Sequence, residues 1–161
     1  MAIKRTNADI WFSKAVRARD GACLVCGTDQ SLECAHIYGR RRKIVRYSMD
    51  NAVTLCHHHH RVMTENPLSF SGFLEVHLGA GHLEILTEKC RGILKENKAV
   101  RDEIAKHYRE EVRKKEKNPD YVIVSYNLLP LCYNYRATEE CCHVCTEPKA
   151  VFCRAASHRR Y

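Results

Sequence analysis

Apolar and polar positions follow two periods along the chain, and the change of period separates predicted helices from predicted strands. The first apolar stripe recurs at about one helical turn and consists of Ile10, Trp11, Ala15 and Val16. With Asn7 or Asp9 as a cap, it predicts a short helix that ends at Asp20-Gly21. The short, largely apolar run 31–38 predicts a strand, and residues 44–47 are expected to form a return segment.

Helical patterns dominate the middle of the chain. Residues 50–55 lead into a predicted helix that carries four consecutive histidines and stops before Asn66-Pro67. Pro67 favours the start of another helix, which Gly79 ends. The remaining elements are expected to be a strand at 82–86, one long or two shorter helices over 87–117, and a strand at 121–126.

Charge and composition narrow the class of protein. The chain of 161 residues has a formal net charge of +8, and residues 1–65 hold 11 basic and 6 acidic side chains, a net of +5. This excess favours an acidic partner such as DNA. No run approaches the roughly 18 apolar residues of a membrane span, and the N-terminus lacks the apolar core of a signal peptide. We therefore expect a cytoplasmic protein with no membrane partner.

Ten cysteines are interleaved with histidines, a pattern that favours metal ligation over a disulfide scaffold. Cys23-x2-Cys26 and Cys56-x2-His59 have the spacing of two halves of one tetrahedral zinc site with no open position. The alternative is two unrelated pairs of buried thiols. The zinc reading predicts a structural Zn²⁺ that ties a tight turn to the start of the histidine-bearing helix.

Four adjacent histidines cannot share one ion, because neighbouring side chains on a helix point about 100° apart. If His59 closes the zinc site, His60 points elsewhere and is free to face the segment between the two half-sites. That segment offers His36 and Asn51. His57 and His58 are expected to face solvent.

The residues Leu32-Glu33-x-x-His36-Ile37 and Asn51-x8-His60, framed by Cys-x2-Cys and Cys-x2-His, resemble the HNH endonuclease family. These are ββα-metal nucleases that often have a zinc-knuckle frame. The resemblance covers residues 20–65. A wider run that includes Arg19-Asp20, Ala35-His36 and Arg46-Tyr47 is also similar to phage recombination endonucleases of lambdoid type.

The resemblance implies metal-dependent hydrolysis of DNA phosphodiester bonds that leaves a 5′-phosphate. It implies that His36 is the general base on a water, and that Asn51 and His60 hold a divalent catalytic ion such as Mg²⁺ or Mn²⁺. Ala35 departs from the family, because many members have a metal-binding Asp or His there. Glu33, on the same strand face, could supply the missing carboxylate, or His36 itself binds the metal and another group takes the proton.

Two further groups complete the candidate sites. The basic loop and its neighbour are expected to contact DNA phosphates through Arg40, Arg41, Arg42, Lys43 and Arg46. A second structural zinc is expected near the C-terminus, on Cys142, Cys145, Cys153 and His158. The alternative for the basic loop is a solvated charge run. For the second zinc set, Cys132 or Cys141 could replace a ligand, and the alternative is free thiols or a disordered tail.

Together these patterns predict an α+β fold with a ββα-metal HNH core. We expect a nuclease core with its N-terminal helix over 1–65, a helical extension over 66–120 and a cysteine-rich zinc segment over 121–161. Phage or host recombination or replication proteins are candidate partners, which would place the chain in a bacterial cytoplasm. The alternative function is a catalytically impaired, zinc-stabilised DNA- or RNA-binding protein.

Overall fold

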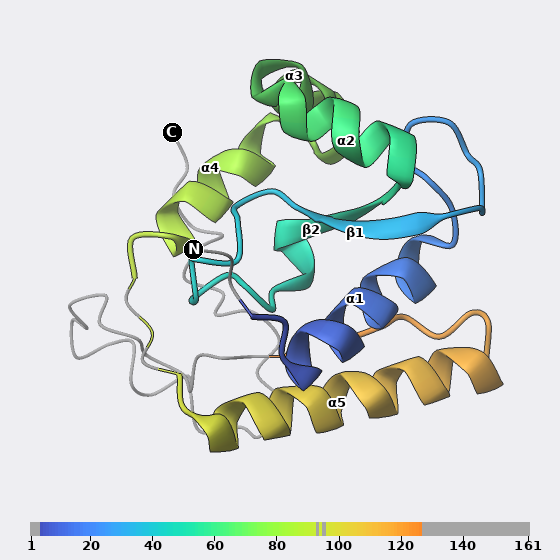
Figure 1. Cartoon of the computed structure of the whole chain (residues 1–161), viewed down its shortest axis with the longest axis vertical. Coiled ribbons are helices and arrows are strands. Elements are labelled where there is room, and N and C mark those ends of the chain that lie inside the picture. Colours follow the sequence, from blue (N-terminus) through green and yellow to red (C-terminus); the bar gives the residue numbers. More distant parts are fainter. Residues whose placement is uncertain (1–3, 93, 95, 127–161) are drawn as a thin grey trace, which may run out of the picture. The chain divides into compact units, whose positions relative to one another are not determined.

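The structure is a computed structural model, and it describes residues 4–92, 94 and 96–126 (Figure 1). These residues belong to one compact unit, Met1–Tyr126, so the segments expected at 1–65 and 66–120 lie in the same unit. The described residues form five α-helices, a short 3-10 helix and a two-stranded sheet, a mixed α+β fold. None of the described helices is long and apolar enough to cross a membrane.

Helix α1 (Asn7–Asp20) forms over the predicted apolar stripe, but the expected cap is wrong: the N-cap is Thr6, and Asn7 and Asp9 lie inside the helix. The Thr6 side chain accepts from the Asp9 backbone N–H, and the Asp9 carboxylate accepts from the Thr6 N–H, which makes a reciprocal capping box. At the other end, Gly21 adopts φ 71°, a left-handed conformation that suits glycine. The helix buries Phe12 and Val16 completely, so it forms one wall of the core.

Strands β1 (Leu32–His36) and β2 (Ala52–Cys56) pair antiparallel, with Leu32 opposite Cys56 and His36 opposite Ala52. The prediction that residues 44–47 form the return segment is therefore wrong, because the strand that pairs with β1 is β2. Turn bonds fold the intervening segment instead: the Val45 N–H donates to the Arg42 carbonyl, and a 3-10 helix (Met49–Asn51) follows. These turns bury residues 45–47 beneath α1, where they cannot join the sheet.

Helices α2 (His57–Glu65) and α3 (Pro67–Leu78) occupy the predicted ranges, and α4 (Ala80–Lys89) follows Gly79. The strand expected at 82–86 is wrong, because this run lies inside α4. The reason is packing: Leu83 touches the apolar cluster under the sheet and Leu86 is fully buried, a spacing that a helix satisfies.

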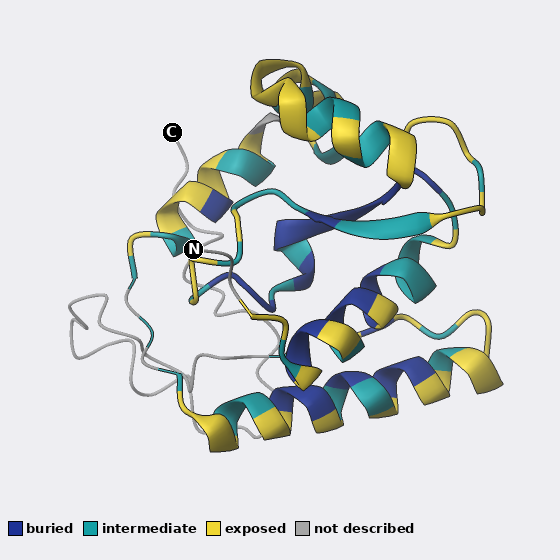
Figure 2. Ribbon diagram, viewed as in Figure 1, coloured by how far each residue is buried: buried dark blue, intermediate teal, exposed yellow. Residues whose placement is uncertain are grey.

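Helix α5 (Lys98–Lys117) packs along α1 and presents its buried face to that helix (Figures 1 and 2). Asn97 caps it by accepting from the Val100 N–H, so the predicted helical stretch 87–117 is divided between α4 and α5. The strand expected at 121–126 is absent from the described residues. Its backbone instead bonds to side chains of α5, with the Val124 N–H donating to Glu111 and the Tyr126 N–H to the Tyr108 hydroxyl.

Candidate metal centre and candidate active site

The structure brings Cys23, Cys26, Cys56 and His59 into one group, whose ligand atoms all lie within 4.8 Å of one another. The first two residues come from a tight turn, in which the Gly27 N–H donates to the Cys23 carbonyl and Gly27 adopts φ 71°. The other two are the end of β2 and the first turn of α2. A bond from the Leu24 N–H to the Thr54 carbonyl holds the turn against the strand. Among the described residues, no second group of three or more metal-ligating side chains meets this distance limit.

The spacing of these atoms fits a tetrahedral zinc ion. Bond lengths of about 2.3 Å to sulfur and about 2.0 Å to nitrogen give tetrahedral edges of about 3.8 Å between sulfurs and about 3.5 Å between sulfur and nitrogen. The Cys26 and Cys56 sulfurs are 4.0 Å apart, and His59 Nδ1 lies 3.6 Å from the Cys23 sulfur and 3.2 Å from that of Cys56. These distances exceed a disulfide bond by far. The Cys3His cluster could therefore hold a zinc ion.

The pKa shifts in the cluster differ between its members. At Cys26 a backbone hydrogen bond from Thr28 is outweighed by desolvation and by the neighbouring sulfurs of Cys23 and Cys56, so the pKa of its thiol is raised. Burial raises the pKa of the Cys23 thiol, but backbone N–H groups of Cys56, Cys26 and Val25 outweigh it and lower that pKa to about 6. Cys34, outside the cluster, behaves in the opposite way, because burial raises its pKa to about 12. A thiolate is the form that binds metal, so Cys23 is prepared for ligation and Cys34 is inert.

His36 ends β1 with its ring against α1. Its Nε2 lies 3.1 Å from the Arg46 carbonyl oxygen, which is an acceptor only, so Nε2 carries the proton and Nδ1 is left with a lone pair. The ring centroid of Phe12 is 5.4 Å away. Burial lowers the pKa of His36 to about 4, so the imidazole is neutral at working pH.

Asn51, expected to hold the catalytic ion, has its amide buried and hydrogen-bonded within the protein. It is 0% exposed, its Oδ1 accepts from the Tyr38 N–H, and its Nδ2 donates to the carbonyls of Tyr38 and Val45. These bonds engage both polar atoms of the amide. In this arrangement Asn51 cannot face an ion, and its role is to hold the loop that follows β1.

His60 contacts Glu33, the residue that the sequence offers in place of a ligand at position 35. His60 Nδ1 lies 2.5 Å from one carboxylate oxygen of Glu33, and His57 Nδ1 lies 2.9 Å from the other. Hydrogen bonds from His60 and then His57 lower the pKa of Glu33. The three side chains line a shallow cavity of about 250 Å³ together with Arg61, Thr64 and Glu65.

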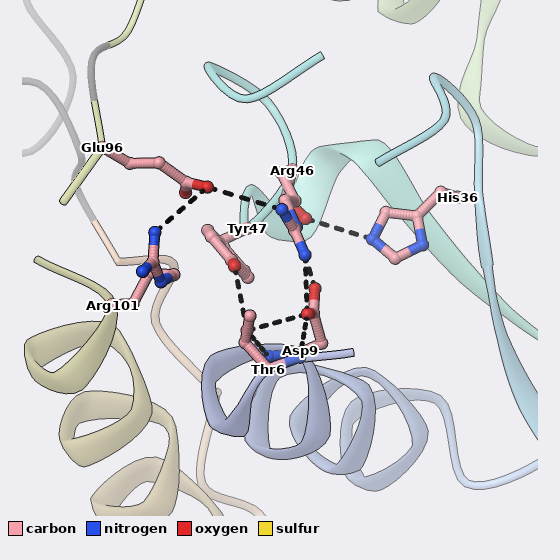
Figure 3. A network of polar contacts seen from close by, with 7 residues as sticks. All are labelled: Thr6, Asp9, His36, Arg46, Tyr47, Glu96 and Arg101. Carbon is pink, nitrogen blue, oxygen red and sulfur yellow. Dashed lines mark hydrogen bonds and ion pairs between the residues drawn. The ribbon is translucent and has the colours of Figure 1, made fainter. Parts of the chain in front are cut away.

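The basic segment divides into two parts. Arg41, Arg42 and Lys43 are exposed and Arg40 is half-buried, which leaves the loop accessible to a phosphate backbone. Arg46 is the exception, because it is only 4% exposed and its guanidinium bonds to Asp9 and Glu96 (Figure 3). Its expected role in DNA binding is therefore wrong: a buried arginine held by two carboxylates cannot reach a phosphate.

The structure thus joins the four cysteine and histidine ligands, and joins Glu33 to His60, but it does not join His36 or Asn51 to His60 by any contact among the described residues. The second zinc set, Cys142, Cys145, Cys153 and His158, lies outside the described residues. Sequence patterns missed Asp9, whose carboxylate reaches across to Arg46. Its only local signal is the helix cap, which gives no hint of a distant partner.

Comparisons with known proteins add no relative: no family model, no curated protein and no solved structure matches this chain.

Proposed function

We propose that this chain is a metal-dependent DNA endonuclease of the HNH type, with His36 as the general base. The order β1–β2–α2, with a Cys3His cluster joining the turn before β1 to the start of α2, supports the proposal. The observation that carries it is the hydrogen bond from His36 Nε2–H to the Arg46 carbonyl. A histidine held in this way has a fixed tautomer and a free Nδ1 lone pair, as a general base requires.

The proposed step is hydrolysis of one phosphodiester bond. His36 Nδ1 removes a proton from a water, the water oxygen forms a bond to phosphorus, and the bond between phosphorus and the 3′ oxygen breaks. The 3′ oxygen takes a proton from solvent water, His36 returns its proton to solvent, and the other product keeps the 5′-phosphate. A divalent ion such as Mg²⁺ or Mn²⁺ would supply charge neutralisation at the phosphate.

Glu33 and His60 are the residues that fit this ion. A carboxylate and an imidazole both ligate divalent metals, and these two come from facing elements beside the same cavity. The engaged amide of Asn51 makes it a supporting residue in this proposal. Ala35 remains a departure from the family pattern, and its effect is that Glu33 has to carry the ligand role.

Cleavage of supercoiled plasmid tests the proposal. The parent protein is incubated with Mg²⁺, Mn²⁺ or Ni²⁺ beside His36→Ala and Glu33→Ala, with His58→Ala as a matched control for an exposed histidine on α2. We expect nicked or linear product from the parent and the control, and at least a hundredfold slower cleavage from His36→Ala. Equal cleavage by His36→Ala would refute the role of His36, and unchanged cleavage by Glu33→Ala would refute that of Glu33.

A second function is favoured by a separate observation. The Cys3His cluster is the only set of three or more close metal ligands in the described part of the chain, and position 35 carries no ligand. These facts support a zinc-stabilised DNA- or RNA-binding protein without catalysis. A gel-shift assay decides between the two, because this alternative predicts salt-sensitive binding by parent and His36→Ala alike, with no cleavage by either.

A further inference from the structure

A buried ion pair lies behind the histidine of β1 and reaches it through one backbone carbonyl. Arg46 donates from Nε to one oxygen of Asp9 at 2.9 Å and from a terminal nitrogen to the other at 2.7 Å (Figure 3). The same residue's carbonyl is the acceptor for His36 Nε2. The side chain of Arg46 therefore faces α1, while its carbonyl faces His36.

Asp9, the residue on α1 that binds Arg46, is itself held in place. Asp9 is 5% exposed, and the same carboxylate that binds Arg46 accepts from the Thr6 backbone N–H at 2.7 Å and from the Thr6 hydroxyl at 2.7 Å. The planar arginine fork matches a carboxylate at two points, which a lysine cannot reproduce. Asp9 thus has a fixed position, and Arg46 has a fixed position relative to it.

Other contacts secure the backbone on both sides of the Arg46 carbonyl. On one side, Asn51 Nδ2 donates to the Val45 carbonyl at 3.0 Å. On the other side, the Tyr108 hydroxyl donates to the Tyr47 carbonyl. Glu96 adds a third contact, 3.4 Å from a terminal nitrogen of Arg46, from the segment before α5.

We propose that Asp9 and Arg46 are positioning residues for His36, and that their ion pair fixes the carbonyl that holds the His36 proton on Nε2. As a consequence, His36 is held in one tautomer, with the proton on Nε2 and a free lone pair on Nδ1; we call this arrangement the tautomer lock. This deepens the proposed function, because the lock prepares a general base; the tautomer itself is a property of the folded protein and needs neither DNA nor metal.

The test reads the tautomer of His36 directly by long-range ¹⁵N–¹H NMR of the full chain at pH 7, with the signal assigned by its loss in His36→Asn. Arg46→Lys keeps the positive charge but loses the two-point contact with Asp9. Asp9→Asn keeps one oxygen acceptor for Arg46 and keeps the helix cap. We expect the ratio of Nε2–H to Nδ1–H to fall at least about fivefold in Arg46→Lys, the value of one ordinary hydrogen bond, and by less in Asp9→Asn.

The matched control is Arg19→Lys. Arg19 makes the same kind of two-point contact with Asp20, at 2.6 and 2.9 Å, and bonds to the carbonyls of Met49 and Ala52, whereas the carbonyl that accepts from the His36 ring belongs to Arg46. The control should lose stability without changing the tautomer ratio. Far-UV circular dichroism shows which variants are folded. If Arg46→Lys does not fold, the milder variant Asp9→Asn provides the test.

The outcomes separate this inference from the proposed function. A parent-like tautomer ratio in folded Arg46→Lys or Asp9→Asn overturns the inference, and so does an equal change in Arg19→Lys, which would show general loosening. If the ratio changes as expected while the parent does not cleave DNA, the lock stands and the nuclease proposal fails. If both hold, Arg46→Lys should lower the rate of cleavage about tenfold with little change in DNA binding.

Discussion

The zinc cluster makes the sharpest prediction, because its contribution to stability can be worked out from the chain length that it closes. The Cys26 and Cys56 sulfurs are 30 residues apart in sequence and 4.0 Å apart in space. Closing a loop of this length removes conformational entropy from the unfolded chain worth about 4 kcal/mol at 25 °C. A zinc ion present at a thousandfold its dissociation constant gives a similar value, about 4 kcal/mol.

The perturbation that isolates this effect is Cys26→Ser. Cys26 is the exposed member of the cluster, so its replacement removes a ligand with little loss of packing, whereas Cys23 and Cys56 are buried. We expect the variant to bind one zinc equivalent fewer than the parent. Its free energy of unfolding should fall by about 4 kcal/mol, which lowers the melting temperature by about 16 °C for a unit of this size.

The assay combines zinc stoichiometry by atomic emission with thermal unfolding in the presence of a reductant. Cys34→Ala is the matched control, since Cys34 is a cysteine outside the cluster whose thiol is held protonated by burial, with a pKa of about 12. The control should keep the zinc content of the parent. If Cys26→Ser binds as much zinc as the parent, or melts within about 2 °C of it, the four residues do not form a structural zinc site.

Two further predictions concern His36 and the basic loop. The pKa of His36 is about 4 in the folded protein and about 6.5 in an unfolded chain, so the unfolded state takes up the proton first as the pH falls. The associated stability of about 3 kcal/mol is present above pH 6.5 and is lost as the pH falls toward 4; the difference in unfolding free energy between parent and His36→Asn over this range measures it, and a constant difference would contradict it. For the loop, replacing Arg40, Arg41, Arg42 and Lys43 by Ala should weaken DNA binding and reduce the magnitude of the slope of log affinity against log salt by about 3.6, as measured by fluorescence anisotropy. An unchanged slope would show that the loop does not contact phosphates.

The zinc half-sites show how far local spacing carries. Two residues three apart on a turn or at a helix start can point at one ion whatever the rest of the chain does, so each half-site follows from the sequence alone. The meeting of the two half-sites depends on the pairing of β1 with β2. The apolar stripe likewise predicts α1, although the N-cap is Thr6 rather than Asn7 or Asp9. The weak alternation at 82–86 misled because Leu83 and Leu86 fit a helix and a strand equally well until their partners are known.

Arg46 and Asn51 show where local pattern is insufficient. Both lie in a polar segment between the half-sites, and nothing nearby distinguishes an arginine that meets DNA from one that meets Asp9 on a distant helix. Similarly, the residues around Asn51 in the sequence do not distinguish an amide that binds an ion from one that is hydrogen-bonded to the backbone of Tyr38 and Val45. The buried carboxylate and the loop carbonyls that decide these roles come close only when α1 packs against the segment after β1.

The sequence by itself determined the two half-sites, Cys23-x2-Cys26 and Cys56-x2-His59, and the separation of His59 from His60, because each depends on spacing within one turn of chain. The tertiary structure decided that the two half-sites meet, because Cys26 and Cys56 are 30 residues apart and come together only when β1 pairs with β2. Only the tertiary structure decided that Arg46 is an internal anchor, that Asn51 supports a loop, and that Glu33 meets His60. The physical reason is that a polar side chain takes its role from whether water or a partner satisfies it. That partner comes from another part of the chain.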